Sequence, residues 1–183
     1  MRSKNKFILG YAGGMAKSNA LTALVEAASM VQELPVEMVL FGKGVEKPHL
    51  QSLAEKYGLQ QVHFLPPVSK ELVPTLLAQM DVLYIGWQET NLYKYGVSAN
   101  KIFDYLLAEK PILWSGNIGN NPVLEAQAGL AASSQPADIA GAIRKMVAED
   151  SHHLAQWGRN GSAYVRDKHN YRNLAEKFIN AIS

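Results

Sequence analysis

The feature that most constrains the fold of this chain is an alternation between short apolar runs and segments with helical periodicity. The nearly continuous apolar runs span residues 7–11, 36–41, 62–65, 82–86, 111–114 and 129–132. Between them, apolar residues recur every three or four positions, as Leu21, Leu24 and Val25 do. Strands that alternate with helices in this way predict a parallel sheet covered on both faces. We therefore expect an α/β fold with a Rossmann-like, doubly wound parallel sheet of about six strands.

Loops rich in glycine, proline or asparagine follow the predicted strands. These loops contain Gly13-Gly14, Gly42-Lys43-Gly44, Pro66-Pro67-Val68, residues 87–100 and residues 115–121. In an open parallel sheet, ligands bind beyond the carboxyl ends of the strands, and those ends share one edge. The loops therefore predict a ligand site at this edge.

The stretch from Tyr95 to Pro111 runs from a glycine-containing loop into an amphipathic helix that we expect to begin at Ser98 or Asn100. The first turn of a helix has free N–H groups and a positive dipole end, and Lys101 adds a full charge there, so a phosphate would suit this spot. Asp104, three residues further on, could accept hydrogen bonds from two ribose hydroxyls. The same residues also fit an ordinary helix with a cap, a solvated lysine and an exposed acid.

A second candidate phosphate contact follows the first predicted strand. Gly13 and Gly14 let a backbone approach a ligand closely, and Lys17 and Asn19 lie where we expect the next helix to begin. From these residues alone, a tight turn with an asparagine or serine cap is the favoured interpretation. Gly42-Lys43-Gly44 is only half of a dinucleotide fingerprint, because Lys47 stands where the third glycine belongs.

Composition narrows the class of protein. The 183 residues include 48% apolar residues, no apolar run long enough to span a bilayer, and charges that sum to +2 without a block of one sign. We expect a single domain over residues 1–183 and no nucleic-acid partner. The chain has no cysteine and no stretch resembling a signal peptide, which favours a cytoplasmic setting.

Motifs for metal and nucleophilic chemistry are missing from the sequence. The five histidines show no metal-ligand spacing, and there is no Asp-x-Asp, no P-loop and no Gly-x-Ser-x-Gly elbow. We therefore expect no metal and no cofactor, and the residues alone identify no catalytic group.

The run YGVSANKIFDYLLAEKPI, residues 95–112, closely resembles a motif of the group 1, GT4-like glycosyltransferases of surface polysaccharide synthesis. In that subgroup the motif is Y-G-V-S-P-N-K, an apolar residue, F-(D/E)-Y, an apolar residue, then A-x-G-K-P-I. With Gly13-Gly14, Asn19 and Pro66-Pro67-Val68, the likeness covers nearly the whole chain. It implies one half of a GT-B fold, the C-terminal half that binds a nucleotide-sugar donor. The N-terminal half, which binds the acceptor and could associate peripherally with a membrane, would then lie outside these residues.

The resemblance also implies roles for individual residues. Gly13 and Gly14 would lie under the donor diphosphate with Lys17 and Asn19 nearby, and Gly96 and Ser98 would lie in the loop that faces the donor. Asn100 and Lys101 would offer backbone N–H groups to phosphate, and Asp104 would hold the ribose. Pro67 and Val68 would present backbone to the nucleobase, for which uridine is our expectation. The implied reaction is transfer of a sugar from a nucleotide diphosphate sugar, with retention of configuration and no required metal.

The chain departs from the pattern of its relatives at four places. Gly96 stands where many relatives carry the first of two glutamates, and Gly14-Met15 stands where an arginine is common. Ala99 replaces a proline and Glu109 replaces a glycine. We hypothesise that Lys17 substitutes for the arginine.

Three other functions fit parts of the sequence. A non-catalytic nucleotide-sugar-binding or partner-binding domain could keep the fold, and a GT-B-like sugar-nucleotide epimerase would also bind a nucleoside diphosphate. An NAD-dependent oxidoreductase domain shares the architecture, but the first loop lacks G-x-G-x-x-G.

Overall fold

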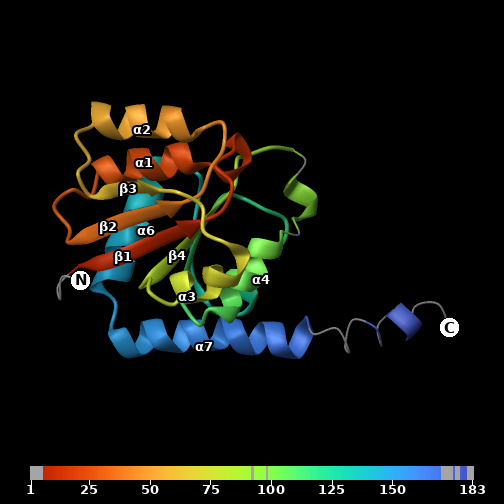
Figure 1. Cartoon of the computed structure of the whole chain (residues 1–183). Helices are drawn as coiled ribbons and strands as arrows, with labels where there is room; N and C mark the ends of the chain where they lie inside the picture. The colour runs from red at the N-terminus through yellow and green to blue at the C-terminus, as the bar shows by residue number, and fades with distance from the viewer. Residues whose placement is uncertain (1–5, 92, 98, 170–174, 176–177, 181–183) are drawn as a thin grey trace.

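A computed structural model describes residues 6–91, 93–97, 99–169, 175 and 178–180. Six parallel strands form one sheet in the order β3-β2-β1-β4-β5-β6 (Figure 1). The strands are β1 (Phe7–Ala12), β2 (Val36–Phe41), β3 (Val62–Leu65), β4 (Val82–Gly86), β5 (Ile112–Ser115) and β6 (Gly129–Ala132). This order reverses between β1 and β4, as in a doubly wound sheet. The predicted Rossmann-like parallel sheet is confirmed.

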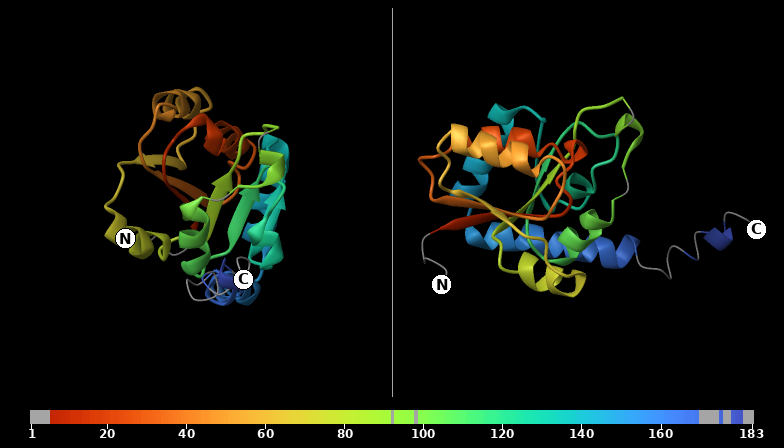
Figure 2. Two further views of the ribbon diagram at one scale, coloured as in Figure 1. Left: turned by 90° about the vertical axis from the view of Figure 1, so that its right-hand side faces the viewer. Right: turned by 45° about the horizontal axis from the view of Figure 1, so that its top comes forward.

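Helices cover both faces of the sheet (Figures 1 and 2). The helices are α1 (Leu21–Ser29), α2 (Lys47–Lys56), α3 (Val73–Leu77), α4 (Asn100–Leu107), α5 (Pro122–Glu125), α6 (Pro136–Ala148) and α7 (Ser151–Lys168). Buried residues of α1, α2 and α6 form one core, and those of α3, α4, α5 and α7 form the other. Every residue of β4 and β5 is buried between these two layers, which explains why both strands read as continuous apolar runs. Among the described residues, no helix combines the length and the apolar character needed to cross a bilayer.

The first loop differs from the expected strand, turn and helix. Lys17–Asn19 form a short 3-10 turn, Ala20 adopts a positive φ of 46°, and α1 begins only at Leu21. Asn19 therefore does not cap α1. Its side-chain amide donates a hydrogen bond back to the Gly14 carbonyl at 2.8 Å, which folds the loop over the end of β1.

Gly42 and Gly44 are packing residues, not part of a dinucleotide fingerprint. The Gly13 N–H donates to the Phe41 carbonyl at 3.0 Å, and the Met15 N–H donates to the Lys43 carbonyl at 2.9 Å. A Cβ on Gly42 would lie 1.9 Å from the Gly13 carbonyl oxygen, and one on Gly44 would lie 2.2 Å from that of Met15. The loop after β2 thus supports the loop after β1 through direct backbone contact.

The turn after α4 contains Glu109, one of the departures from the motif. Glu109 has a positive φ of 55°, the conformation that favours the glycine found there in relatives. The Glu109 carboxylate accepts a hydrogen bond from the Ser162 hydroxyl at 2.9 Å, so this side chain ties the turn to α7.

Candidate functional site

The first loop and the start of α4 meet at the carboxyl edge of the sheet, which faces the viewer in the left panel of Figure 2. The Tyr105 hydroxyl of α4 accepts a hydrogen bond from the Ala12 N–H at 2.6 Å and donates one to the Ala12 carbonyl at 3.0 Å. Burial raises the pKa of this hydroxyl, so it stays protonated and able to donate. Tyr105 thereby fixes α4 against the end of β1.

Lys101 is the central group of this edge. Its ammonium lies over two aromatic rings, 5.2 Å from the centroid of Tyr11 and 5.3 Å from that of Trp87. It donates a hydrogen bond to the side-chain oxygen of Asn19. Burial lowers the pKa of Lys101 to about 8, so the amine is still mainly charged at neutral pH.

No described carboxylate forms an ion pair with Lys101. A largely desolvated cation with neutral partners is costly unless it meets an anion, so the arrangement suits an anionic ligand. The reading of Lys101 as an ordinary solvated lysine is therefore wrong.

A short network links Lys101 to the glycine loop. Asn19, which accepts from Lys101, donates to the Gly14 carbonyl, and the Tyr11 hydroxyl donates to the same carbonyl at 2.6 Å. A Cβ on Gly14 would meet no atom within 4 Å, so the loop presents open space on that side. Lys17 is exposed and Gly13 is half-buried in the same loop. The structure thus brings Gly13, Gly14, Lys17, Asn19 and Lys101 together.

The start of α4 lies beside these residues and adds to the positive charge of Lys101. Asn100 is the first residue of the helix, and Ala99 at the N-cap offers no side chain to the free N–H groups. The Ile102 N–H donates to the Ala99 carbonyl at 3.0 Å, and the positive dipole end of α4 favours an anion at this position. Ser98, which we predicted to lie here, is outside the described residues.

Asp104 lies one turn deeper and is exposed. It lines the rim of a mainly apolar pocket of about 220 Å³ between α3 and α4, with Val73, Pro74, Leu77 and Leu107 among the other lining residues. Pro67 and Val68 lie in the loop that leads from β3 towards α3. A carboxylate beside an apolar pocket could hold a sugar hydroxyl while a flat ring lies against the apolar wall.

Gly96 adopts a positive φ of 108°, and a Cβ there would lie 2.8 Å from the side-chain oxygen of Asn120. That oxygen accepts a hydrogen bond from the Val97 N–H at 2.7 Å, and the Asn120 amide donates to the Val97 carbonyl at 3.1 Å. The loop conformation therefore favours glycine at position 96.

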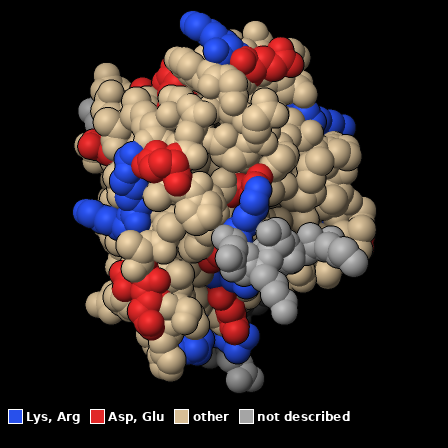
Figure 3. Space-filling model, turned by 90° about the vertical axis from the view of Figure 1, so that its left-hand side faces the viewer, with Lys and Arg blue, Asp and Glu red and all other residues tan. Residues whose placement is uncertain are grey.

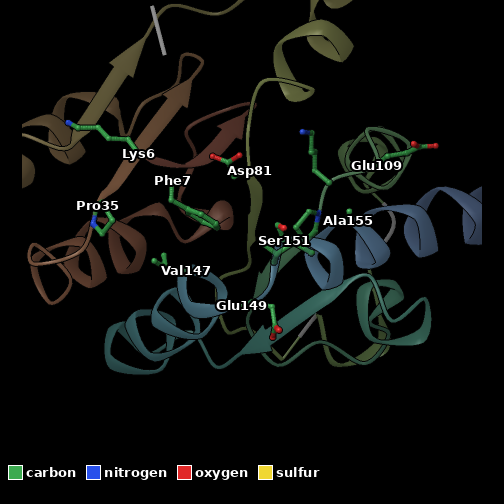
Figure 4. A pocket seen from close by; sticks show the side chains of 12 residues that line it. Lys6, Phe7, Pro35, Asp81, Glu109, Val147, Glu149, Ser151 and Ala155 are labelled. Atoms are coloured by element: carbon green, nitrogen blue, oxygen red, sulfur yellow. The ribbon is translucent and has the colours of Figure 1, made fainter. Parts of the chain in front are cut away.

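A pocket of about 520 Å³ lies at the opposite edge of the sheet (Figure 4). Phe7 at the start of β1 and Pro111 just before β5 line it, and the carboxyl ends of α4 and α6 and the amino end of α7 lie beside it. Helix carboxyl ends disfavour anions and a helix amino end favours them, and acidic and basic side chains are interspersed over this face (Figure 3), so this edge does not favour one sign of charge. We therefore place the anion site at the carboxyl edge.

Residues 2–164 match the family described as Glycosyl transferases group 1. The chain belongs to this family. As a group 1 glycosyl transferase domain it is similar to the putative colanic acid biosynthesis glycosyl transferase WcaI of Escherichia coli (strain K12), with 31% identity over 77 residues. That match covers 42% of this chain and 19% of WcaI.

Solved group 1 relatives and GT-B structures share the fold of this domain. HepE of Anabaena, in complex with UDP and glucose, matches with a TM-score of 0.78 and 17% identity over 97% of this chain and 48% of its own. The C-terminal domain of the group 1 protein LpcC from Francisella tularensis matches with a TM-score of 0.74 and 15% identity over 91% of this chain and 88% of its own. The expected half of a GT-B fold is confirmed, and the domain spans about half the length of HepE.

Sequence reasoning missed three parts of this candidate site. The Tyr11 ring beside Lys101, the Tyr105 hydroxyl and the Asn120 bridge depend on contacts between distant segments. The only local signal was the presence of tyrosine and asparagine next to the predicted loops. In the described part of the chain, no three His, Asp or Glu side chains gather where they could hold a metal ion.

Proposed function

We propose that this domain binds the nucleotide-sugar donor of a retaining, metal-independent glycosyltransferase, with a UDP-sugar as donor. The observation that carries the proposal is the partly desolvated Lys101 ammonium beside an open glycine loop and a helix start. These groups together could stabilise the charge that develops on a departing diphosphate. UDP is favoured because HepE, which has the same fold, was solved in complex with UDP and glucose.

The acceptor is proposed to be a glycan or a lipid-linked glycan, in keeping with the naming of WcaI as a colanic acid biosynthesis enzyme. Transfer would need an acceptor-binding N-terminal domain, which could associate peripherally with a membrane. We also propose that the protein lies in the cytoplasm.

Calorimetric titration with UDP, GDP and NAD tests the donor site. We expect UDP or GDP to bind with micromolar affinity and NAD to bind far more weakly. Binding of NAD alone would favour an oxidoreductase domain. If the folded protein bound none of the three, the donor site would be refuted. The favoured hypothesis would then be a partner-binding domain that kept the fold.

Asp104→Ala is expected to weaken UDP binding by about tenfold or more, because a charged acceptor for two ribose hydroxyls is lost. Asp104 is exposed, so the melting temperature should not change. Inorganic pyrophosphate carries no ribose, and its affinity should stay the same in a competition titration. Glu55→Ala, an exposed acid of α2, is the matched control. Equal losses for UDP and pyrophosphate would contradict a ribose role for Asp104.

UDP affinity should fall as the pH rises through about 8. The pKa of Lys101 in the free protein is about 8, whereas the terminal phosphate of UDP is already ionised at neutral pH. The ligand binds the ammonium form, so affinity should drop about tenfold between about pH 7 and about pH 9. Calorimetry at several pH values should show a slope that Lys101→Met abolishes. An equal slope in the wild type and this variant would assign the titration to another group.

A further inference from the structure

Strand β6 ends the sheet, and no described strand lies beyond it. On the side of β5, the Ala128 carbonyl accepts a hydrogen bond from the Ile112 N–H at 2.9 Å, and the Ala132 carbonyl accepts one from the Gly116 N–H at 3.0 Å. Alternate residues of a strand direct their backbone groups to opposite sides, so the N–H and the carbonyl of Ala131 point outward. Ala131 is exposed, and no described segment forms a backbone hydrogen bond with it on that side. These two groups can therefore pair with another strand.

The opposite edge of the sheet is protected against such pairing. At the end of β3, the Lys47 ammonium donates a hydrogen bond to the Leu65 carbonyl at 3.0 Å, and two prolines, Pro66 and Pro67, follow directly. Charged side chains and prolines are common devices that keep an edge strand from pairing with another chain. Strand β6 has the sequence Gly-Leu-Ala-Ala and contains neither. Of the two edges, β6 is therefore the one that can accept a further strand.

A groove of about 390 Å³ lies beside this edge, between β6 and α6. Strand β6 and the residue after it contribute Leu130, Ala131, Ala132 and Ser133, and α6 contributes Ala137, Asp138, Gly141, Ala142 and Lys145. A Cβ on Gly141 would meet no atom within 4 Å, so the surface of α6 is open at the middle of the groove. Asp138 and Lys145 are the two charged residues in this described lining, one on each side of Gly141 along the helix.

Asp138 and Lys145 make this surface complementary to itself. Both are exposed, and their spacing places them on the same face of α6, about two turns apart. The Asp138 carboxylate accepts a hydrogen bond from the Ser133 hydroxyl at 2.5 Å, and Lys145 forms no ion pair with another described residue. A two-fold axis beside Gly141 would set Asp138 of each copy opposite Lys145 of the other. Because two ion pairs would then form across the axis, a second copy of this chain is the partner that fits the groove.

We infer that this surface is an interface between two copies of the chain, related by a two-fold axis. Ala131 of each copy exchanges N–H···O=C hydrogen bonds with Ala131 of the other, so the β6 strands pair antiparallel and the two sheets become continuous. The α6 helices then lie antiparallel with opposed dipoles. Since α6 packs on β5 as well as β6, it is set back from the edge, and the helices can lie about 8 to 10 Å apart while the strands lie about 4.8 Å apart. The surface contains none of the donor-site residues, so the inference does not rest on the proposed function.

Analytical ultracentrifugation over a range of concentrations tests the interface. The wild type should sediment as a mixture of monomer and dimer with a dissociation constant below about 1 mM. Asp138→Lys and Lys145→Asp each set like charges opposite each other and should weaken the dimer about tenfold. The double variant Asp138→Lys/Lys145→Asp restores both pairs and should return to within about threefold of the wild type. Glu55→Lys, a charge reversal at an exposed residue of α2, is the control and should have no effect.

Gly141→Gln tests the same surface without a change of charge. The added side chain meets open space in the monomer, so the melting temperature of the dilute protein should not fall, but at the two-fold axis it should weaken the dimer about tenfold or more. A wild type that stays monomeric at about 1 mM would overturn the inference, and the edge would then suit an extended segment of another protein. A dimer that Gly141→Gln and both single charge reversals leave unchanged would also overturn it, because the interface would lie elsewhere. Thermal unfolding of each variant shows that its fold is retained.

Discussion

Lys101→Met should weaken UDP binding by about 10- to 100-fold, which is the loss expected when a charged hydrogen bond of about 1.5 to 3 kcal/mol is removed. Methionine keeps the apolar length of the side chain against Tyr11 and Trp87 and removes only the ammonium. Calorimetric titration with UDP measures the effect.

The same variant should be as stable as the wild type or more stable. Burial places the folded-state pKa of Lys101 at about 8, below the ordinary 10.5, so the charged amine lowers stability at neutral pH. For the wild type, this penalty disappears as the pH rises from about 8 to 10.5, whereas Lys101→Met should show no such gain. Thermal unfolding at several pH values measures both effects.

Two further lysines serve as controls for the loss of charge. Lys17→Met removes an exposed cation from the same edge and should weaken UDP binding only several-fold. Lys145→Met, on the exposed face of α6, should have no effect. If UDP bound Lys101→Met within twofold of the wild type, Lys101 would have no part in phosphate binding.

Gly44→Ala should lower the free energy of unfolding by about 3 kcal/mol, because its Cβ would overlap the backbone of Met15. For a chain of this size, such a loss lowers the melting temperature by about 6 to 12 °C. The overlap also displaces the glycine loop, so UDP binding should weaken in parallel.

Gly14→Ala is the matched glycine variant, since the added Cβ meets open space. Its melting temperature should equal that of the wild type, while UDP affinity should fall because the methyl group occupies the side from which the diphosphate approaches. A wild-type melting temperature for Gly44→Ala would contradict the proposed backbone packing of the two loops.

Much of the fold followed from local sequence patterns. The runs 36–41, 62–65, 82–86 and 129–132 match β2, β3, β4 and β6 to the residue, because strand periodicity and the glycines and prolines that end strands are local signals. The helix that starts at Asn100 was likewise expected. The helix expected to begin near Lys17–Asn19 is present, but it begins at Leu21 after a short 3-10 turn, and the Asn19 side chain bonds to the Gly14 carbonyl instead of capping it.

The sequence by itself determined the sheet, the edge at which its loops gather and the residue types placed there. Only the tertiary structure decided the state of Lys101, since Tyr11, Asn19 and Trp87 reach it from other segments. It likewise decided that Gly44 packs on Met15 and that Asn120 holds Val97. Desolvation and long-range backbone contact depend on which segments the topology brings together, and no periodicity along the chain encodes them.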